Sequence, residues 1–225
     1  MKVGIIVVTH QSNIRPTGHA ALDRCIDSIN KYVEFDHDII IVDNGSDAIY
    51  NNPHKCDLLY RPKQVNGLIG AWNDGLFISY EMGHDMHLLI SDDVYFNETI
   101  NKYPLSILNH EQRDCSVYGT LTDSKTAFPT QISEIPLIGY KEVTNNKFTV
   151  HGWLFGFTRT FFQKYSANGL MFENAYLFGG SETYFQEQLW KRGGRSFIIL
   201  DCLTHHEHLG AWRKLANNGS YLKSK

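Results

Sequence analysis

The sequence predicts an α/β fold with a mostly parallel central sheet, and three observations support this prediction. Residues 3–8 and 38–43 form apolar runs rich in β-branched side chains and without alternation, which is typical of strands buried on both faces. Residues 19–32, which lie between these runs, repeat apolar side chains at helical spacing. Strand, helix and strand with short links form a βαβ unit, whose strands are parallel and whose connection is nearly always right-handed.

The alternation of strands and helices continues along the chain. Further strands are expected near residues 57–60, 88–90, 115–121 and 196–200, and further helices near residues 67–82, 97–110, 159–165 and 181–192. Pro104 lies inside one of these helices and predicts a kink or a break there, because proline has no backbone N–H. Residues 122–147 show no clear period, which indicates an irregular segment with short strands or a flexible substrate loop. Glycines within the apolar run 150–157 indicate close approach of a ligand or another backbone.

Length and composition favour one large globular domain. The 225 residues are 42% apolar, which is ample for a sizeable core. The net charge of −3 and the lack of a Lys/Arg cluster argue against a nucleic-acid-binding surface. The four widely spaced cysteines favour buried thiols over a disulfide framework. The N-terminal apolar run is too short for a signal peptide or a membrane span, so we expect a cytoplasmic protein without a membrane span.

Two adjacent carboxylates, Asp92 and Asp93, follow the buried run 88–90 directly. In open α/β sheets, ligands bind in the crevice beyond the carboxyl ends of the strands. Two adjacent acids repel each other, so the pair indicates a cation beside it. Carboxylate oxygens favour Mg²⁺ or Mn²⁺, which commonly bind together with substrate phosphates. The alternative is that both acids cap the helix that follows.

Several segments together resemble the GT-A glycosyltransferases, specifically the family 2-like group. They are Ile6-Val7-Val8-Thr9, Ile41-Val42-Asp43-Asn44-Gly45-Ser46, Asn66-Gly67-Leu68-Ile69-Gly70-Ala71-Trp72-Asn73, Ile90-Ser91-Asp92-Asp93-Val94, the run from Gly152 to Arg159 and the helix from Glu182 to Gly193. Each motif alone is weak, but their order and spacing are fairly specific. The resemblance covers nearly the whole chain except residues 122–147. It implies a GT-A (Rossmann-like) three-layer sandwich as one domain over residues 1–225, with a nucleotide-binding half at about 1–95 and an acceptor and catalytic half at about 96–225.

The resemblance also implies an activity. It is the transfer of a sugar from a nucleoside diphosphate sugar, with a UDP-sugar favoured, to an acceptor hydroxyl of a saccharide or glycan. The reaction would depend on a divalent cation, Mn²⁺ or Mg²⁺, and would invert the anomeric centre. One alternative is a retaining or nucleotidyl-transferring enzyme on the same fold. Another is a non-catalytic sugar- or nucleotide-binding module, which the absence of an acid at Ser91 favours.

The resemblance assigns donor-binding roles to residues at several loops. Asp43 would accept a hydrogen bond from the nucleotide base, although an Asp at this position also favours a simple turn. Asp92 would meet the ribose or the sugar of the donor. The remaining predicted donor contacts are Thr9, His10, Gln11, Asn66, Gly67 and Asn73. His10 and Gln11 replace the aromatic residue and the Asn usual in the family. In the segment from Asn66 to Asn73, the glycines permit close approach of a ligand, and the start of the helix favours phosphate oxygens. The alternative is that this segment is only a glycine-rich entry into a helix.

The resemblance places the metal ligands at Asp93 and at a late histidine. Asp93 occupies the last position of the family's Asp-x-Asp pattern, and Ser91 replaces its first acid. Among His205, His206 and His208 we expect His206 to bind the metal, unless these histidines form only a solvated loop. A zinc site is not indicated, because the chain has no HExxH spacing and no cysteine partner for these histidines.

Glu182 is the predicted general base, which would take the proton of the acceptor hydroxyl. Counting back from Gly193, it occupies the second position of the family's Glu-Asp pair, and Ser181 replaces the first acid. A first-turn Glu also complements the helix dipole without any catalytic role. Trp153 is a candidate for stacking against the acceptor sugar, although aromatic residues more often belong to the core.

Overall fold

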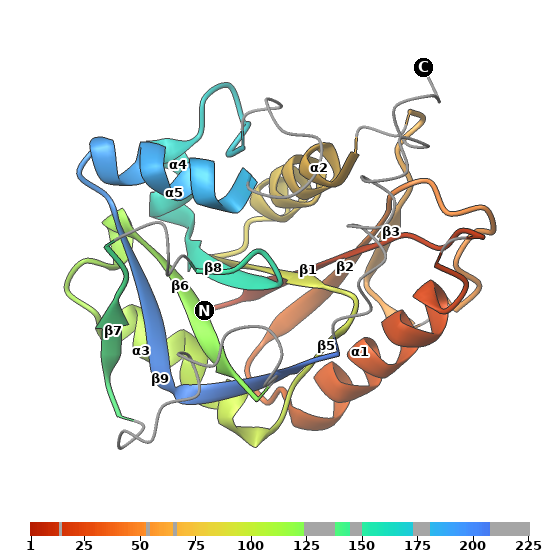
Figure 1. Ribbon diagram of the computed structural model, residues 1–225, viewed down its shortest axis with the longest axis horizontal. Helices are drawn as coiled ribbons and strands as arrows, with labels where there is room; N and C mark the ends of the chain where they lie inside the picture. The colour runs from red at the N-terminus through yellow and green to blue at the C-terminus, as the bar shows by residue number, and fades with distance from the viewer. Residues whose placement is uncertain are drawn as a thin grey trace.

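The protein is a sheet with helices on both faces, and Figure 1 shows this arrangement. The computed structural model describes residues 1–13, 15–52, 55–64, 67–123, 138–144, 150–172 and 181–207. The strands are β1 (Val3–Thr9), β2 (His37–Asp43), β3 (Leu58–Tyr60), β4 (Met86–Ser91), β5 (Val94–Tyr95), β6 (Ser116–Thr122), β7 (Tyr140–Glu142), β8 (Leu154–Thr158) and β9 (Arg195–His206). The helices are α1 (Gly18–Tyr32), α2 (Gly67–Glu81), α3 (Lys102–Asn109), α4 (Arg159–Tyr165) and α5 (Ser181–Lys191).

The strand order confirms the predicted α/β class. The order is β3-β2-β1-β4-β8-β6-β9-β5, with β7 added alongside β9. The four strands β3, β2, β1 and β4 are mutually parallel, β8 is antiparallel to its neighbours, and β6 pairs in parallel with β9. The sheet is therefore mostly parallel in its first half, where the predicted nucleotide-binding motifs lie.

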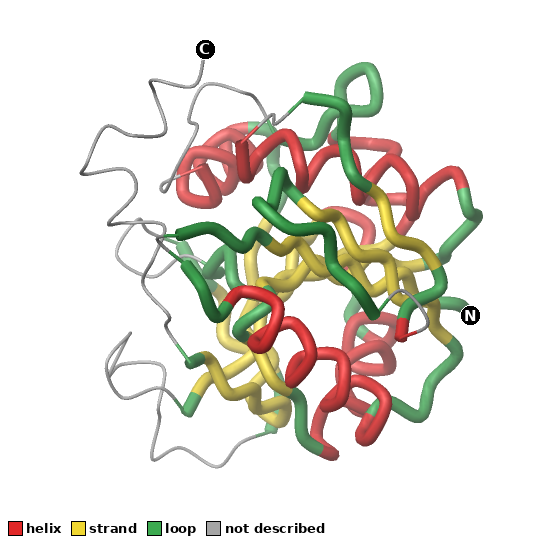
Figure 2. Tube along the Cα trace, turned by 90° about the vertical axis from the view of Figure 1, so that its right-hand side faces the viewer, coloured by secondary structure: helices red, strands yellow, loops and turns green. Residues whose placement is uncertain are grey.

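Helices cover both faces of the sheet and make three layers (Figures 1 and 2). One apolar cluster fills the space between the sheet and each helical layer. Alternate residues of β1 face opposite layers: Val3, Ile5 and Val7 pack with α1 and α3. Ile6 and Val8 pack on the other face with α2, α4 and α5. Burial on both faces explains why β1 reads as a continuous apolar run rather than an alternating one.

Two expectations about element boundaries were wrong. The break in the predicted helix 97–110 does not fall at Pro104: a 3₁₀ turn at Glu98–Asn101 leads into α3, and Pro104 lies in the first turn of α3. A first-turn proline forfeits no intrahelical hydrogen bond, so it is tolerated there. The last strand is also longer than expected, because β9 runs on from Arg195 to His206.

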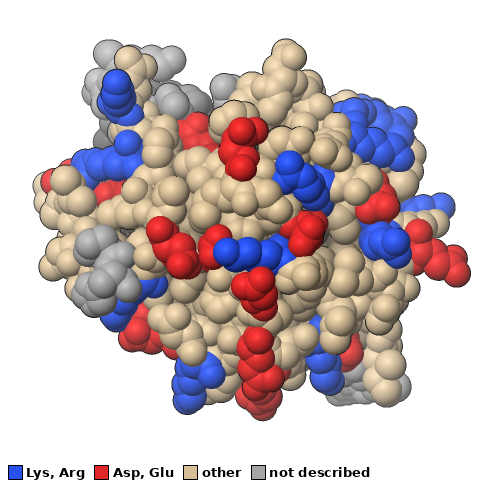
Figure 3. Space-filling view, turned by 180° about the vertical axis from the view of Figure 1, so that it is seen from behind, with Lys and Arg blue, Asp and Glu red and all other residues tan. Residues whose placement is uncertain are grey.

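The described helices include none that is both long and apolar enough to cross a membrane. Cys25 and Cys202 are buried, Cys56 and Cys115 are half-buried, and all four are free thiols. The face seen in Figure 3 carries acidic and basic side chains intermixed rather than gathered by sign.

His87 of β4 is fully buried and provides a test of the packing through pH. Its Nδ1 lies 2.8 Å from the Ser79 hydroxyl, and its ring packs against Phe157 and Phe162. Burial lowers the pKa of His87 to about 3. The unfolded chain takes up a proton here below about pH 6.5, whereas the folded chain does not, so stability is lost as pH falls from about 6.5 toward 3.

We therefore expect the unfolding free energy of the wild type to lose up to about 1.4 kcal/mol per pH unit in this range because of His87 alone. In His87→Leu this component disappears, so the stability of the wild type relative to the variant falls as pH falls. Urea titrations of both at pH 7.5, 6 and 5 measure it. Two curves that stay parallel over this range would contradict a neutral, buried His87.

Candidate active site

The strand register brings the predicted polar residues together at one edge of the sheet. Thr9 at the end of β1 is paired with Asp43 at the end of β2, and Val8 is paired with Ser91 at the end of β4. Asp92 comes directly after β4, and its Oδ2 accepts a 2.6 Å hydrogen bond from the Thr9 hydroxyl. Parallel strands end at the same edge, which is where such folds bind ligands.

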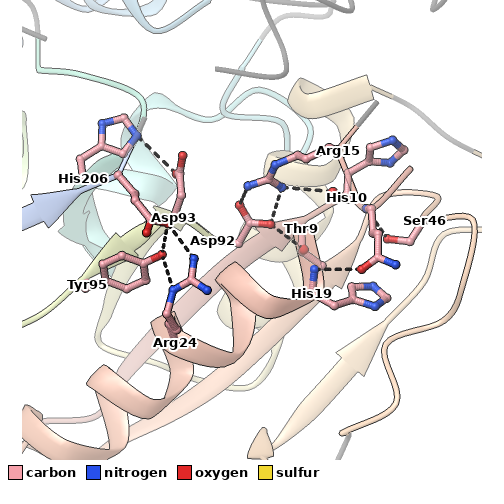
Figure 4. Close-up of polar contacts among 12 residues, drawn as sticks. Thr9, His10, Arg15, His19, Arg24, Ser46, Asp92, Asp93, Tyr95 and His206 are labelled. Carbon is pink, nitrogen blue, oxygen red and sulfur yellow. Dashed lines mark hydrogen bonds and ion pairs between the residues drawn. The ribbon is translucent and has the colours of Figure 1, made fainter. Parts of the chain in front are cut away.

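Asp92 forms a buried ion pair with Arg15, which the sequence analysis did not identify (Figure 4). Arg15 Nη1 donates to Asp92 Oδ2 at 2.6 Å and to the His10 carbonyl at 3.1 Å, and Nη2 donates to Asp92 Oδ1. Both side chains are only 3% exposed. Burial alone lowers the pKa of Arg15, but the attraction of Asp92 outweighs it and raises that pKa. The sequence predicted a cation beside the two acids. For Asp92, the guanidinium of Arg15 supplies this positive charge.

Asp43 takes part in a turn and in an ion pair. It is fully buried, and its Oδ1 accepts the backbone N–H of Ser46 at 3.0 Å, as the turn interpretation predicts. Its Oδ2 lies 3.3 Å from Arg61 Nη1, and Arg61 Nη2 donates to the Ser46 carbonyl at 2.6 Å. Arg61 directly follows β3, and the sequence pattern gave no sign of this contact. The recognition of a base by Asp43 stays a prediction.

His10 and Gln11 join the loop after β1 to the loop after β2. The Gln11 side-chain oxygen accepts the backbone N–H of His19 at 3.1 Å, and the Gln11 N–H donates to the Ser46 hydroxyl at 2.9 Å. His10 Nδ1 lies 3.0 Å from the Asn44 carbonyl oxygen. These contacts fix the walls of the site, and direct donor contacts by either residue stay predictions.

The predicted residues around α2 are placed only in part. Asn66 lies outside the described residues, and Gly67 begins α2 with a φ of 69°, a conformation that favours glycine. Asn73 is 3% exposed, and its side chain holds the backbone of residues 171 and 172 through three hydrogen bonds of 2.9–3.0 Å. The structure thus gives Asn73 an anchoring role that the sequence analysis did not predict, and its contact with the donor stays a prediction.

Asp93 and His206 meet across the short ladder between β5 and β9 (Figure 4). Val94 is paired with His206, and the Asp93 Oδ1 and His206 Nε2 atoms are 3.3 Å apart. Their side chains are 11% and 10% exposed. His205 differs, because its side chain is 50% exposed and its Nδ1 bonds Asp123 Oδ1 at 2.7 Å. His208 lies outside the described residues.

The spacing of the Asp93 and His206 atoms fits two adjacent ligands of one octahedral cation. With ligand distances of about 2.1 Å, neighbouring ligand atoms lie about 3 Å apart. Among the described residues, no group of three or more His, Cys, Asp or Glu side chains is arranged to hold a metal ion. A cation at this pair would therefore take its other ligands from substrate oxygens or water, as Mg²⁺ and Mn²⁺ commonly do.

Glu182, in the first turn of α5, lies against the segment that precedes β8. Gln186 fixes the helix there, because it donates to the Val150 carbonyl at 2.7 Å and accepts the Val150 N–H at 2.9 Å. A Cβ added to Gly152 would lie 3.4 Å from the Glu182 carboxyl carbon and 2.8 Å from Trp72. The glycine thus permits close approach of two side chains, where the sequence predicted a ligand or another backbone, and it brings Glu182 next to residue 152.

Trp153 connects this region to the Asp93–His206 pair. It is 8% exposed, its ring stacks on His151 with centroids 4.2 Å apart, and it packs against His206 at 4.9 Å. The Trp153 carbonyl also accepts the Ser91 N–H at 2.8 Å. Residues 152 and 153 therefore lie between the predicted base and the predicted metal ligands, and acceptor stacking by Trp153 stays a prediction.

Gly152→Ala tests whether this close approach matters. The new methyl group must displace the Trp72 ring, which is 2.8 Å away, whereas the Glu182 carboxyl carbon, 3.4 Å away, is at ordinary contact distance. A shift of about 1 Å passed on to the predicted base can lower the rate about 100-fold. We expect a similar loss of turnover with a smaller change in stability. Gly75→Ala is the control, because its Cβ would lie 2.4 Å from an Ile6 methyl carbon. Gly75→Ala should lower the stability of the protein but keep the activity of each folded molecule. An equal loss of activity in both variants would contradict the assignment of Glu182 as the base.

Comparison with known proteins identifies the fold. No family model and no curated protein matches the chain. The structure matches GalNAc-T7 crystallised with UDP, GalNAc and Mn²⁺ at a TM-score of 0.70 and 14% identity, over 92% of this chain and 44% of that one. It matches S. aureus TarS at 0.65 and 15%, over 92% of this chain and 36% of that one. It also matches TarS 1–349 in complex with UDP-GlcNAc at 0.62 and 16%, over 91% and 58%.

The chain thus spans 36–58% of the length of the three matched chains. At these identities the likeness establishes the arrangement of the chain, and it confirms the predicted three-layer architecture. The protein has the GT-A fold, which it shares with glycosyltransferases.

Proposed function

We propose that the protein is a glycosyltransferase that transfers a sugar from a nucleoside diphosphate sugar to an acceptor hydroxyl with the help of Mn²⁺ or Mg²⁺. The observation that carries this proposal is the Asp93–His206 pair, 3.3 Å apart at the carboxyl edge of the sheet. The GT-A fold supports it, as do the UDP, UDP-GlcNAc and Mn²⁺ in the structures of similar proteins. A UDP-sugar is the donor we favour.

In this proposal the two halves of the chain divide the substrates. Residues before about 95 bind the nucleotide, with Asp43 accepting a base N–H and Thr9 and Arg15 holding Asp92 in place. Asp93 and His206 would hold the divalent cation, which supplies positive charge to stabilise the leaving diphosphate. Residues after about 95 bind the acceptor, which is a saccharide or glycan.

Glu182 acts on the acceptor in this mechanism. Its carboxylate takes the proton of the acceptor hydroxyl while that oxygen attacks the anomeric carbon of the donor. The nucleoside diphosphate leaves from the opposite face, so one displacement inverts the anomeric configuration. Trp153, next to Gly152 and packed on His206, supports the surface on which the acceptor sugar would stack.

A thermal-shift screen of nucleotide sugars tests the proposal. Ligands that bind the folded state raise apparent stability, so we expect stabilisation by a UDP-sugar that requires Mn²⁺ or Mg²⁺. The variant His206→Gln should lose the metal-dependent part of the shift. His205→Gln is the matched control, because its side chain bonds Asp123 instead. If no nucleotide sugar stabilises the wild type with either metal, the proposal fails.

A further inference from the structure

Three residues form a mutual contact beside the Asp93–His206 pair: Arg24 of α1, Tyr95 of β5 and Glu207, which follows β9. Figure 4 labels Arg24 and Tyr95. Arg24 Nη2 donates to Glu207 Oε2 at 2.7 Å, and the Tyr95 hydroxyl donates to the same oxygen at 2.6 Å. Arg24 Nε donates to the Tyr95 oxygen at 3.2 Å, and its guanidinium lies 5.6 Å from the centroid of the Tyr95 ring. We refer to these three residues as the clasp.

The clasp holds both chain segments that carry the predicted metal ligands. Tyr95 is two residues after Asp93, and Glu207 directly follows His206. The Glu207 N–H also donates to the Asp93 carbonyl at 3.0 Å. The ladder between β5 and β9 has only two residue pairs, Val94 with His206 and Tyr95 with His205. So short a ladder fixes the two strand ends weakly by itself, and the clasp adds side-chain contacts from a helix outside the ladder.

The clasp is partly exposed, which indicates that it positions the neighbouring residues more than it adds to the free energy of folding. The Arg24 and Glu207 side chains are 48% and 34% exposed. Exposed ion pairs usually add little to the free energy of folding, because water and salt screen them. The hydrogen bonds described for Asp43 and Asp92 do not involve Arg24 or Tyr95. Changes at these two residues therefore leave the predicted nucleotide-binding contacts in place.

We propose that Arg24, Tyr95 and Glu207 are positioning residues that set the spacing of Asp93 and His206 and thereby the affinity for the divalent cation. This inference rests on the proposed function, because it takes Asp93 and His206 as the metal ligands. Groups that orient metal ligands from outside the coordination sphere typically change metal affinity by about tenfold or more when they are removed.

The affinity for Mn²⁺ can be measured directly by titration in the presence of UDP. Electron paramagnetic resonance reports the concentration of free Mn²⁺. Tyr95→Phe removes one hydroxyl and keeps the ring, and we expect about tenfold weaker Mn²⁺ binding. Glu207→Ala should have a similar effect, and Glu207→Gln a smaller one, since the amide oxygen still accepts from Tyr95. The thermal unfolding midpoint without ligands should stay within a degree or two of the wild type, as for other exposed contacts.

Arg195→Gln is the matched control. It removes an ion pair of the same length, 2.7 Å from Arg195 to Glu142, at the opposite end of the same strand β9. Its Mn²⁺ affinity should equal that of the wild type. If wild-type protein binds no Mn²⁺ with UDP, the proposed function and the role of the clasp both fall. If the wild type binds Mn²⁺ and Tyr95→Phe and Glu207→Ala bind it equally well, or if Arg195→Gln weakens it as much, the clasp alone is overturned.

Discussion

Replacing Arg15 with methionine is expected to lower the free energy of unfolding by about 3–5 kcal/mol, the usual cost of breaking a buried ion pair on one side. Asp92 would keep its hydrogen bond from Thr9 but lose both contacts with the guanidinium while it remains buried. Burial raises the pKa of Asp92 even with Arg15 and Thr9 acting against it. Urea-induced unfolding at neutral pH measures the loss.

Two further variants make this test specific. Arg15→Met combined with Asp92→Leu should recover most of the lost stability, because well-packed apolar residues often replace a buried pair at little cost. Arg195→Met removes an exposed pair and should change stability by less than about 1 kcal/mol. An Arg15→Met protein that is no less stable than Arg195→Met would contradict a buried, ionised pair.

Glu182→Gln is expected to lower the rate of sugar transfer by about 10²- to 10⁴-fold, the usual contribution of a general base. The amide has nearly the shape of the carboxylate but takes no proton, so binding of the UDP-sugar and the metal should not change. The variant Glu187→Gln on the same helix α5 is the control and should retain the wild-type rate. Single-turnover rates with saturating donor separate chemistry from binding. An unchanged rate in Glu182→Gln, with donor binding retained, would show that another group takes the proton.

The sequence predicted the parallel half of the sheet well, because burial on both faces leaves a direct trace in the residues. The apolar runs that became β1, β2 and β4 contain few polar residues, and their ends are marked by polar residues such as Thr9 and Asp43. Once these strands are taken as parallel, their ends must meet at one edge. The proximity of Thr9 to Asp92 follows from this topology, and the structure confirms it.

The partners of the acids were not predictable from pattern. Arg15 and Arg61 lie in polar loops, where a charged side chain is expected to face water, and only the folded chain brings them to Asp92 and Asp43. The extent of β9 was missed for a related reason. Its last residues include Asp201, His205 and His206, and such a polar sequence reads as a loop until pairing with β6 and β5 holds it extended.

The distinction between Asp92 and Asp93 shows what each level of description adds. Position in the motif predicted unequal roles, with Asp93 toward a metal and Asp92 toward the donor. The structure places Asp93 beside His206 and gives Asp92 a cation of its own in Arg15. Asp93 is therefore the acid on which the proposed cation site depends most.

The release of UDP from a UDP-sugar in the presence of Mn²⁺ tests the central claim most directly, with wild type, Asp93→Asn and Asp123→Asn compared at saturating donor. Both aspartates bond one of two consecutive histidines, but the Asp93–His206 side chains are 11% and 10% exposed, whereas those of Asp123 and His205 are 48% and 50% exposed. We predict Mn²⁺-dependent release by wild type and Asp123→Asn and a loss of at least about 100-fold in Asp93→Asn, comparable to other groups that stabilise charge in the transition state. Equal release by all three proteins would contradict a metal-assisted transfer at Asp93 and His206.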